Sequence, residues 1–171
     1  MDTADRLFRR LEQLNEIGAA LSKERDIERL LESILIAAKA ITHADGGTLY
    51  RVTEDGQALR FEIVRTDSLN FALGGTTGKP VGFPDLPLHD VAGAPNNSLV
   101  AVHAALSGET VNIADAYYEA GFDFSGTADF DRRTGYRSRS FLTVPMRNHE
   151  DEIIGVLQLI NRAFLPSTSM T

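Results

Sequence analysis

The chain of 171 residues contains no cysteine. This absence excludes a disulfide framework and a thiolate metal site, and it is consistent with a reducing compartment. No apolar run approaches the roughly 18 residues that span a membrane, and residues 1–6 lack the charged-then-apolar form of a signal peptide. We therefore expect a cytoplasmic protein without a membrane partner. A hydrophobic fraction of 43% is enough for the core of one domain.

Positive charge is also scarce, with 17 basic against 24 acidic residues and a formal net charge of −7. Nucleic acid would not be attracted to such an acidic surface, so we expect no nucleic-acid partner. One short stretch runs against this background, and it carries Arg132, Arg133, Arg137 and Arg139. It could be a binding site, the entrance to a strand, or a solvated turn.

Metal-binding and catalytic patterns are missing as well. The four histidines lack ligand spacing, and Asp123, Asp129 and Asp131 do not follow the calcium-loop pattern. The stretch GGTTGK at 74–79 lacks the first glycine and the final Ser or Thr of a phosphate loop, which favours a flexible lid. No serine has the glycine frame of a nucleophile elbow. We expect no catalytic residues and no metal site.

Helical periodicity dominates the N-terminal part of the chain. One narrow apolar stripe consists of Leu7, Leu11, Leu14, Ile17 and Leu21. Asp26 can cap a second helix, which has a wider stripe between Ile27 and Ile41. The wide stripe suits burial on a domain, whereas the narrow one resembles a two-helix seam. The first helix could therefore form a dimer contact or pack on its own domain.

Alternating and apolar runs predict strands at 47–53, 58–64, 110–113, 140–146 and 153–160. Residues 54–56 form a turn between the first two, Pro145 requires an edge or strand-end place, and the last run is apolar enough for the buried centre of a sheet. The stretch 67–98 is rich in Gly and Pro and is predicted to be irregular and lid-like. Short helices are predicted near 99–106 and 125–133. This order indicates an α+β domain with an antiparallel sheet and flanking helices.

The predicted helix at 125–133 could bind a ligand. Ser125 or Thr127 would lie near its cap, and its free N–H groups suit an anion such as phosphate. Asp131, Thr134 and Ser138 could meet the polar edge of a planar molecule. The same residue types are equally ordinary at helix ends, with Thr134 closing the helix before a glycine. Since Arg137 and Arg139 alternate with Ser138, they should face away from it.

Four stretches of sequence resemble the GAF domain family of small-molecule sensor modules. They are FDRRTGYRSRSFLTVPM (130–146), IIGVLQLINR (153–162), ALSGETVNIADAY (105–117) and AITHADGGTLYRV (40–52). The resemblance implies a sheet of about six antiparallel strands, with the ligand held under a mobile region on one face. It also implies an N-terminal signalling or dimerisation helix at 1–24, a GAF domain at 25–165 and a short tail at 166–171.

The resemblance further implies a set of ligand-binding residues, because these positions match those near the nucleotide in cyclic-nucleotide-binding members. They are Thr48, Val100, Ala101, Thr127, Asp131, Thr134, Ser138 and Gln158. The ligand would be cyclic AMP or cyclic GMP. Family members often have an acidic residue where this chain has Gln158, and an amide there changes which ligand edge is read.

The sequence departs from the family pattern at the family's C-terminal Asn-Lys-Phe-Asp-Glu motif. Asn161, Arg162 and Phe164 match its beginning, but the Asp and Glu are missing, so either the chain was cut from a longer protein or the motif is degenerate. We expect a non-catalytic regulatory fragment of a bacterial signalling protein. It would form a homodimer through its N-terminal helices and control an output domain such as a phosphohydrolase or cyclase. The alternative is a dimerisation module with a vestigial pocket. Relatives of this fold that reduce free methionine sulfoxide depend on cysteine, which disfavours an enzyme here.

Overall fold

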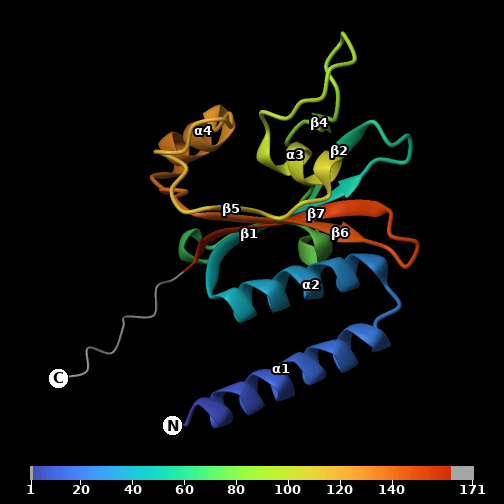
Figure 1. Ribbon diagram of the computed structural model, residues 1–171, viewed down its shortest axis with the longest axis vertical. Helices are drawn as coiled ribbons and strands as arrows, with labels where there is room; N and C mark the ends of the chain where they lie inside the picture. The colour runs from blue at the N-terminus through green and yellow to red at the C-terminus, as the bar shows by residue number, and fades with distance from the viewer. Residues whose placement is uncertain (1, 163–171) are drawn as a thin grey trace, which may run out of the picture.

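The computed structural model describes residues 2–162, which form an α+β domain built on one antiparallel sheet (Figure 1). Its helices are α1 (Thr3–Lys23), α2 (Ile27–Thr42), α3 (Val100–Ser107) and α4 (Ser125–Thr134). Its strands are β1 (Ala44–Val52), β2 (Ala58–Thr66), β3 (Phe71–Gly74), β4 (Leu86–Pro87), β5 (Val111–Ile113), β6 (Phe141–Arg147) and β7 (Ile153–Arg162). The predicted fold class is confirmed. Within the described residues, no helix is both long and apolar enough to cross a membrane.

The strands lie in the order β3-β2-β1-β7-β6-β5, and β4 adds a seventh strand beside β2. The apolar run of β7 lies in the middle, as predicted, because β1 and β6 pair with its two edges. Pro145 also lies where its missing N–H is tolerated. The pairing of β5 with β6 ends at Thr143, so the outer edge of β6 is unpaired at Pro145.

Helices cover both faces of the sheet: α2 lies on one face, and α3 and α4 lie on the other (Figure 1). Side chains alternate along β1, so Leu49 packs with Leu35 of α2 while Tyr50 packs with Val102 of α3. The sheet is therefore buried on both sides. A third cluster joins the start of α3 to β5 and β6, and includes Val100 and Phe141.

The two N-terminal helices differ in burial, as their stripes predicted. Asp26 caps α2, since its Oδ1 accepts hydrogen bonds from the backbone N–H of Glu28 (2.9 Å) and Arg29 (3.3 Å). Helix α1 lies beyond α2, away from the sheet (Figure 1), and buries none of its residues. Leu7 and Leu11 are exposed by 61% and 52%. The narrow stripe is thus largely uncovered in the single chain.

One expectation for the middle of the chain is wrong. Residues 67–98 are not irregular throughout, because they contain β3, β4 and the 3-10 turns η1 (Asp67–Leu69) and η2 (Gly75–Thr77). These strands are too short to show periodicity, and the outer edge of β2 stabilises them by pairing.

Ser125 and Thr127 lie in the first turn of α4, near its N-cap, as expected. The N-cap residue itself is Phe124, and Asp123 accepts the Ser125 N–H at 2.9 Å. Of the expected family motif, Phe164 lies outside the described residues, as does the proposed tail.

Candidate functional site

A row of polar side chains crosses the centre of the sheet on the face covered by α3 and α4. Thr48 of β1 pairs with Gln158 of β7, which pairs in turn with Thr143 of β6. All three residues are buried, and Thr143 is 0% exposed. The same row continues into apolar neighbours on both sides, with Val64 of β2 next to Thr48 and Val111 of β5 next to Thr143. A polar centre thus lies between apolar ends, as is usual for a small-molecule site.

Hydrogen bonds hold the amide of Gln158 in place. Its Nε2 donates to Thr143 Oγ1 at 3.1 Å, and its Oε1 accepts a longer bond of 3.3 Å from the Tyr50 hydroxyl. Burial raises the pKa of Tyr50 well above its usual value, so this hydroxyl stays protonated and acts as a donor. The amide keeps one further N–H, and Thr48 adds a hydroxyl. Together they could pair with both donors and acceptors on the edge of a planar ligand.

A second polar cluster fastens α4 to its neighbouring segments. Asp131 is the one buried residue among the ten of α4. Its carboxylate accepts three hydrogen bonds: from the Ser138 N–H (2.9 Å), the Ser138 hydroxyl (2.7 Å) and the Tyr117 hydroxyl (2.5 Å). Asp131 and Ser138 therefore lie together, but they are hydrogen-bonded to each other. As arranged, they brace α4 against the loops before and after it.

The other residues implied by the family resemblance lie apart from these two clusters. Val100 and Ala101 are buried in the apolar core at the start of α3. Thr127 is half-buried on α4. Thr134 closes α4, as the alternative interpretation had it, because its hydroxyl donates to the Phe130 carbonyl at 2.7 Å and Gly135 follows with a φ of 74°.

Sequence reasoning missed the contact that draws the end of α4 towards the sheet. The hydroxyl of Tyr136 donates to Asp45 Oδ2 at the start of β1, at 2.7 Å. Phe130 of α4 lies between Tyr136 and Phe71 of β3, with ring centroids 6.4 Å and 5.8 Å away. Aromatic side chains thus bridge α4 and β3 on the face of the sheet covered by α3 and α4. Tyr136 belongs to the GAF-like stretch, but nothing in the sequence pointed to Asp45 as its partner.

Asn161 organises the connection from α4 to β6, and it was noted in the sequence only as the beginning of the family's C-terminal motif. Its Oδ1 accepts from the N–H of Arg139 (2.6 Å) and of Ser140 (3.2 Å), and its Nδ2 donates to the Arg137 carbonyl (2.6 Å). Asn161 has a φ of 56°, a conformation that asparagine tolerates better than most residues. One amide thereby fixes three consecutive peptide groups.

The arginine cluster lies on the surface. Arg137 and Arg139 are exposed while Ser138 between them is buried, as predicted. Their charges are nevertheless used locally, since Arg137 lies 4.5 Å from the ring centre of Tyr117 and Arg139 pairs with Asp115 at 3.1 Å. These contacts hold the segment before α4 against the segment after it.

The side chains of the polar row are buried beneath α3 and α4 in this structure. Two surface hollows, of about 310 and 290 Å³, lie on either side of Arg65 and Asp67. Neither is lined by any of the eight candidate residues. Within residues 2–162, no group of His, Asp or Glu side chains is arranged to hold a metal ion.

Comparison with known proteins agrees with this architecture. Residues 26–169 match the profile of the GAF domain family. Curated relatives include the cGMP-specific 3',5'-cyclic phosphodiesterases of Drosophila virilis and Drosophila melanogaster, each 28% identical over 152 residues, or 86% of this chain. The alignment spans only 15% and 12% of the lengths of these two relatives.

Solved structures share the fold at lower identity. The GAF domain of a phosphoenolpyruvate-protein phosphotransferase from Coxiella burnetii has a TM-score of 0.63 at 16% identity, covering 89% of this chain and 77% of that one. A free methionine-R-sulfoxide reductase from Neisseria meningitidis, solved with its substrate, has a TM-score of 0.59 at 18% identity, covering 95% and 77%. The same fold thus occurs in a domain of a phosphotransferase and in a methionine sulfoxide reductase.

Proposed function

The chain belongs to the GAF domain family, and from this we propose that it is a non-catalytic sensory domain that binds a small molecule beneath α3 and α4. The observation that carries the proposal is the row formed by Thr48, Gln158 and Thr143. Polar side chains at the centre of a sheet cost free energy unless they are satisfied, and an apolar row would pack as well. A ligand that forms hydrogen bonds with these residues would offset that cost.

A cyclic nucleotide is the ligand we propose, with cyclic GMP and cyclic AMP as the two candidates. Support comes from the cGMP-specific phosphodiesterases, which are 28% identical to this chain over an alignment that covers 86% of it. The Gln158 amide offers an acceptor and donors, which suit the edge of a purine. The Thr127 region at the start of α4 would lie towards the phosphate, where helix N–H groups favour negative charge.

We propose that the domain controls an output domain of a longer protein, such as a phosphohydrolase or cyclase. The small share of the curated relatives' length that the chain spans supports this view. The absence of cysteine supports a non-catalytic role. A methionine sulfoxide reductase of this fold needs a thiol to accept the oxygen from its substrate, and this chain has none.

Calorimetry with cyclic GMP and cyclic AMP at up to millimolar concentration tests the proposal. We expect saturable heat for one nucleotide, weakened about tenfold by Thr48→Val or Gln158→Leu because each removes a hydrogen-bonding group from the site. Thr110→Val and Gln57→Leu make the same changes at exposed positions and should bind normally. If neither nucleotide gives heat or raises the melting temperature, a cyclic nucleotide is not the ligand.

A second candidate function, a dimerisation module, has its own support in α1. This helix buries none of its residues, and Leu7, Leu11 and Leu14 are at least half exposed. An isolated helix gains little from propensity alone, so a second copy of α1 would provide the missing packing. Deletion of residues 1–24 should convert a dimer into a monomer in sedimentation velocity. Leu11→Lys should do the same while Glu12→Lys should not, and a truncated chain that still sediments as a dimer would contradict this assignment.

A further inference from the structure

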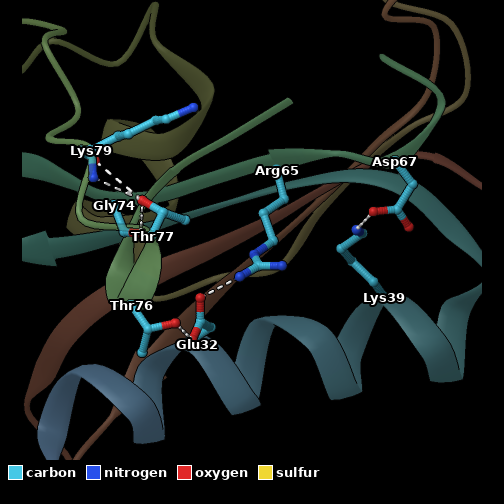
Figure 2. Close-up of polar contacts among 8 residues, drawn as sticks. All are labelled: Glu32, Lys39, Arg65, Asp67, Gly74, Thr76, Thr77 and Lys79. Atoms are coloured by element: carbon cyan, nitrogen blue, oxygen red, sulfur yellow. Dashed lines mark hydrogen bonds and ion pairs between the residues drawn. The ribbon is translucent and has the colours of Figure 1, made fainter. Parts of the chain in front are cut away.

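Two ion pairs fasten α2 to the β2–β3 edge of the sheet (Figure 2). Glu32 pairs with Arg65 of β2, and Lys39 Nζ lies 2.5 Å from Asp67 Oδ1 just beyond the end of that strand. Glu32 and Lys39 are about two helical turns apart and so lie on one side of α2. The helix presents a negative and then a positive charge, and the strand presents the complementary order. We call these four residues the charge clamp.

The charges of the clamp on α2 are buried. Glu32 and Lys39 are exposed by only 7% and 6%, although charged residues are seldom buried without a partner. A buried ion pair is often no more stabilising than an apolar pair of the same volume. Its best-attested use is to specify one alignment of the parts it joins. If α2 slid by one turn, each buried charge would lose its partner, so the clamp opposes a slide of α2 along β2 by a full turn while leaving smaller shifts open.

Glu32 also holds the segment that follows β3. Its second carboxylate oxygen accepts a hydrogen bond of 2.6 Å from the Thr76 hydroxyl in η2 (Figure 2). Gly75, with a φ of 57°, brings the backbone so close that an added Cβ would lie 3.0 Å from Glu32 Oε1. The stretch 74–79 is closed by its own bond from Gly74 N to Lys79 O, at 2.7 Å. The GGTTGK sequence thus forms a closed turn that is hydrogen-bonded to α2.

The other end of this segment lies on the ligand-side face. β3 immediately precedes η2, and its Leu73 pairs with Val64, the neighbour of Thr48 in the polar row. Phe71 of β3 meets Phe130 of α4. Four residues of β3 therefore run from contacts with α4 on one face to a turn held by α2 on the other. A displacement of β3 by a ligand cannot leave η2 and Glu32 in place.

Arg65 shows that the clamp has room for a second arrangement. Its Nη2 binds Glu32, while its Nε is the one side-chain nitrogen or oxygen buried without a hydrogen bond among the described residues. Arginine and carboxylate pair most strongly through two parallel bonds, and this pair lacks that form. A small shift of η2 and α2 could change how the guanidinium binds the carboxylate.

We propose that Glu32 is a positioning residue that couples β3 and η2 to α2, so that movement on the ligand side changes the alignment of α2 and with it α1. The direction of signalling rests on the proposed sensory function. The mechanical coupling itself does not, because it depends only on contacts within this chain. On the output side, the segment that contacts α1 would receive this change.

Native-state hydrogen exchange of the whole chain tests the coupling without any ligand. Glu32→Gln should raise exchange across 71–79 by at least about tenfold, because the amide cannot keep the ion pair. Thr76→Val, made outside α2, should raise exchange in the first half of α2. Asp85→Asn is the matched control, since it breaks an exposed ion pair with another arginine of β2, Arg60. It should change neither segment.

A charge-swapped double variant distinguishes loss of the ion pair from a general loss of stability. Glu32→Arg combined with Arg65→Glu should restore part of the protection that either single change removes. If exchange in 71–79 is unchanged in Glu32→Gln, or α2 is unchanged in Thr76→Val, the coupling is overturned. Thr76→Val decides the matter even if Glu32→Gln fails to fold.

Cyclic GMP at millimolar concentration, as a probe, separates this inference from the proposed function. If it binds, it should alter exchange in α2 as well as in β3, and Glu32→Gln should change its affinity. Binding that protects β3 and leaves α2 unchanged would overturn the coupling. If cyclic GMP does not bind, the proposed ligand is wrong, and the exchange of the three variants still decides whether the clamp couples the two segments.

Discussion

Tyr136 and Asp45 lie 91 residues apart in the chain, and the tyrosine hydroxyl donates a hydrogen bond of 2.7 Å to the aspartate. The bond connects the segment after α4 to the start of β1. Ser68 donates two further bonds to the same carboxylate, from its N–H (3.0 Å) and its hydroxyl (2.6 Å). The start of β1, the turn η1 and the segment after α4 therefore meet at one side chain.

Removing the Tyr136 hydroxyl should destabilise the domain. Tyr136→Phe keeps the ring against Phe130 but loses a hydrogen bond to a charged group, which costs about 1–2 kcal/mol. Urea unfolding measures the loss. Tyr118→Phe is the matched control, since Tyr118 is 84% exposed and should tolerate the change. Equal stability of the two variants would mean that the bond to Asp45 contributes nothing.

Asp45 should make stability fall in acid. Burial raises the pKa of Asp45, but the hydrogen bonds from Ser68 and Tyr136 and the charge of Lys39 outweigh it, so the pKa lies below its usual 3.8. A depressed folded-state pKa contributes stability that is present above the unfolded value and is lost as pH falls through the folded value. Urea midpoints between pH 6 and pH 3 should therefore fall below about pH 4. Asp45→Asn should show a shallower fall, and an unchanged profile would contradict this role.

Asp131 should tolerate an amide better than truncation. Asp131→Ala leaves the Ser138 N–H and hydroxyl buried without an acceptor and should cost about 3 kcal/mol. In Asp131→Asn the Ser138 hydroxyl can turn to accept from the new amide, so the cost should be smaller. Asp129→Ala, at an exposed position of the same helix, should be nearly neutral. Thermal unfolding should rank the three variants in that order.

Three glycines in one segment should respond differently to alanine. At Gly74 the φ is 77° and an added Cβ would lie 1.9 Å from the Glu62 carbonyl oxygen, so Gly74→Ala should prevent normal closure of the turn. Gly78→Ala meets no atom within 4 Å but has a φ of 72°, and should cost about 1–2 kcal/mol. Gly82→Ala has neither problem and should be neutral. A Gly74→Ala protein as stable as Gly82→Ala would refute the geometry of η2.

The sequence predicted best what depends on neighbouring residues. Alternation identified β1 and β2, an apolar run identified β7, and Asp26 identified the start of α2. The family motifs identified Thr48 and Gln158, but Thr143 became visible only once the register of β6 on β7 was known. Its side chain is an ordinary threonine in an ordinary strand, and only the pairing places it beside Gln158.

What the sequence could not predict depends on contacts between distant segments. The sequence made Asp131 a candidate ligand residue by its type and place, but it did not predict that Tyr117 and Ser138 donate hydrogen bonds to its carboxylate. Residues 74–79 looked flexible because glycine-rich stretches usually are. Their conformation is set by Glu32, which lies 44 residues before Thr76. No local pattern carries information of that kind.

The edges of the sheet have a consequence for how copies of the chain can aggregate. Beside β2 the outer positions are filled by β3 and β4, of four and two residues. At the opposite side β5 has three residues, and Pro145 interrupts the donors on the uncovered part of β6. Within residues 2–162, neither margin offers a long, flat row of backbone groups onto which another sheet could extend. Fibre growth by strand addition at these margins is therefore disfavoured, although the apolar side of α1 is exposed.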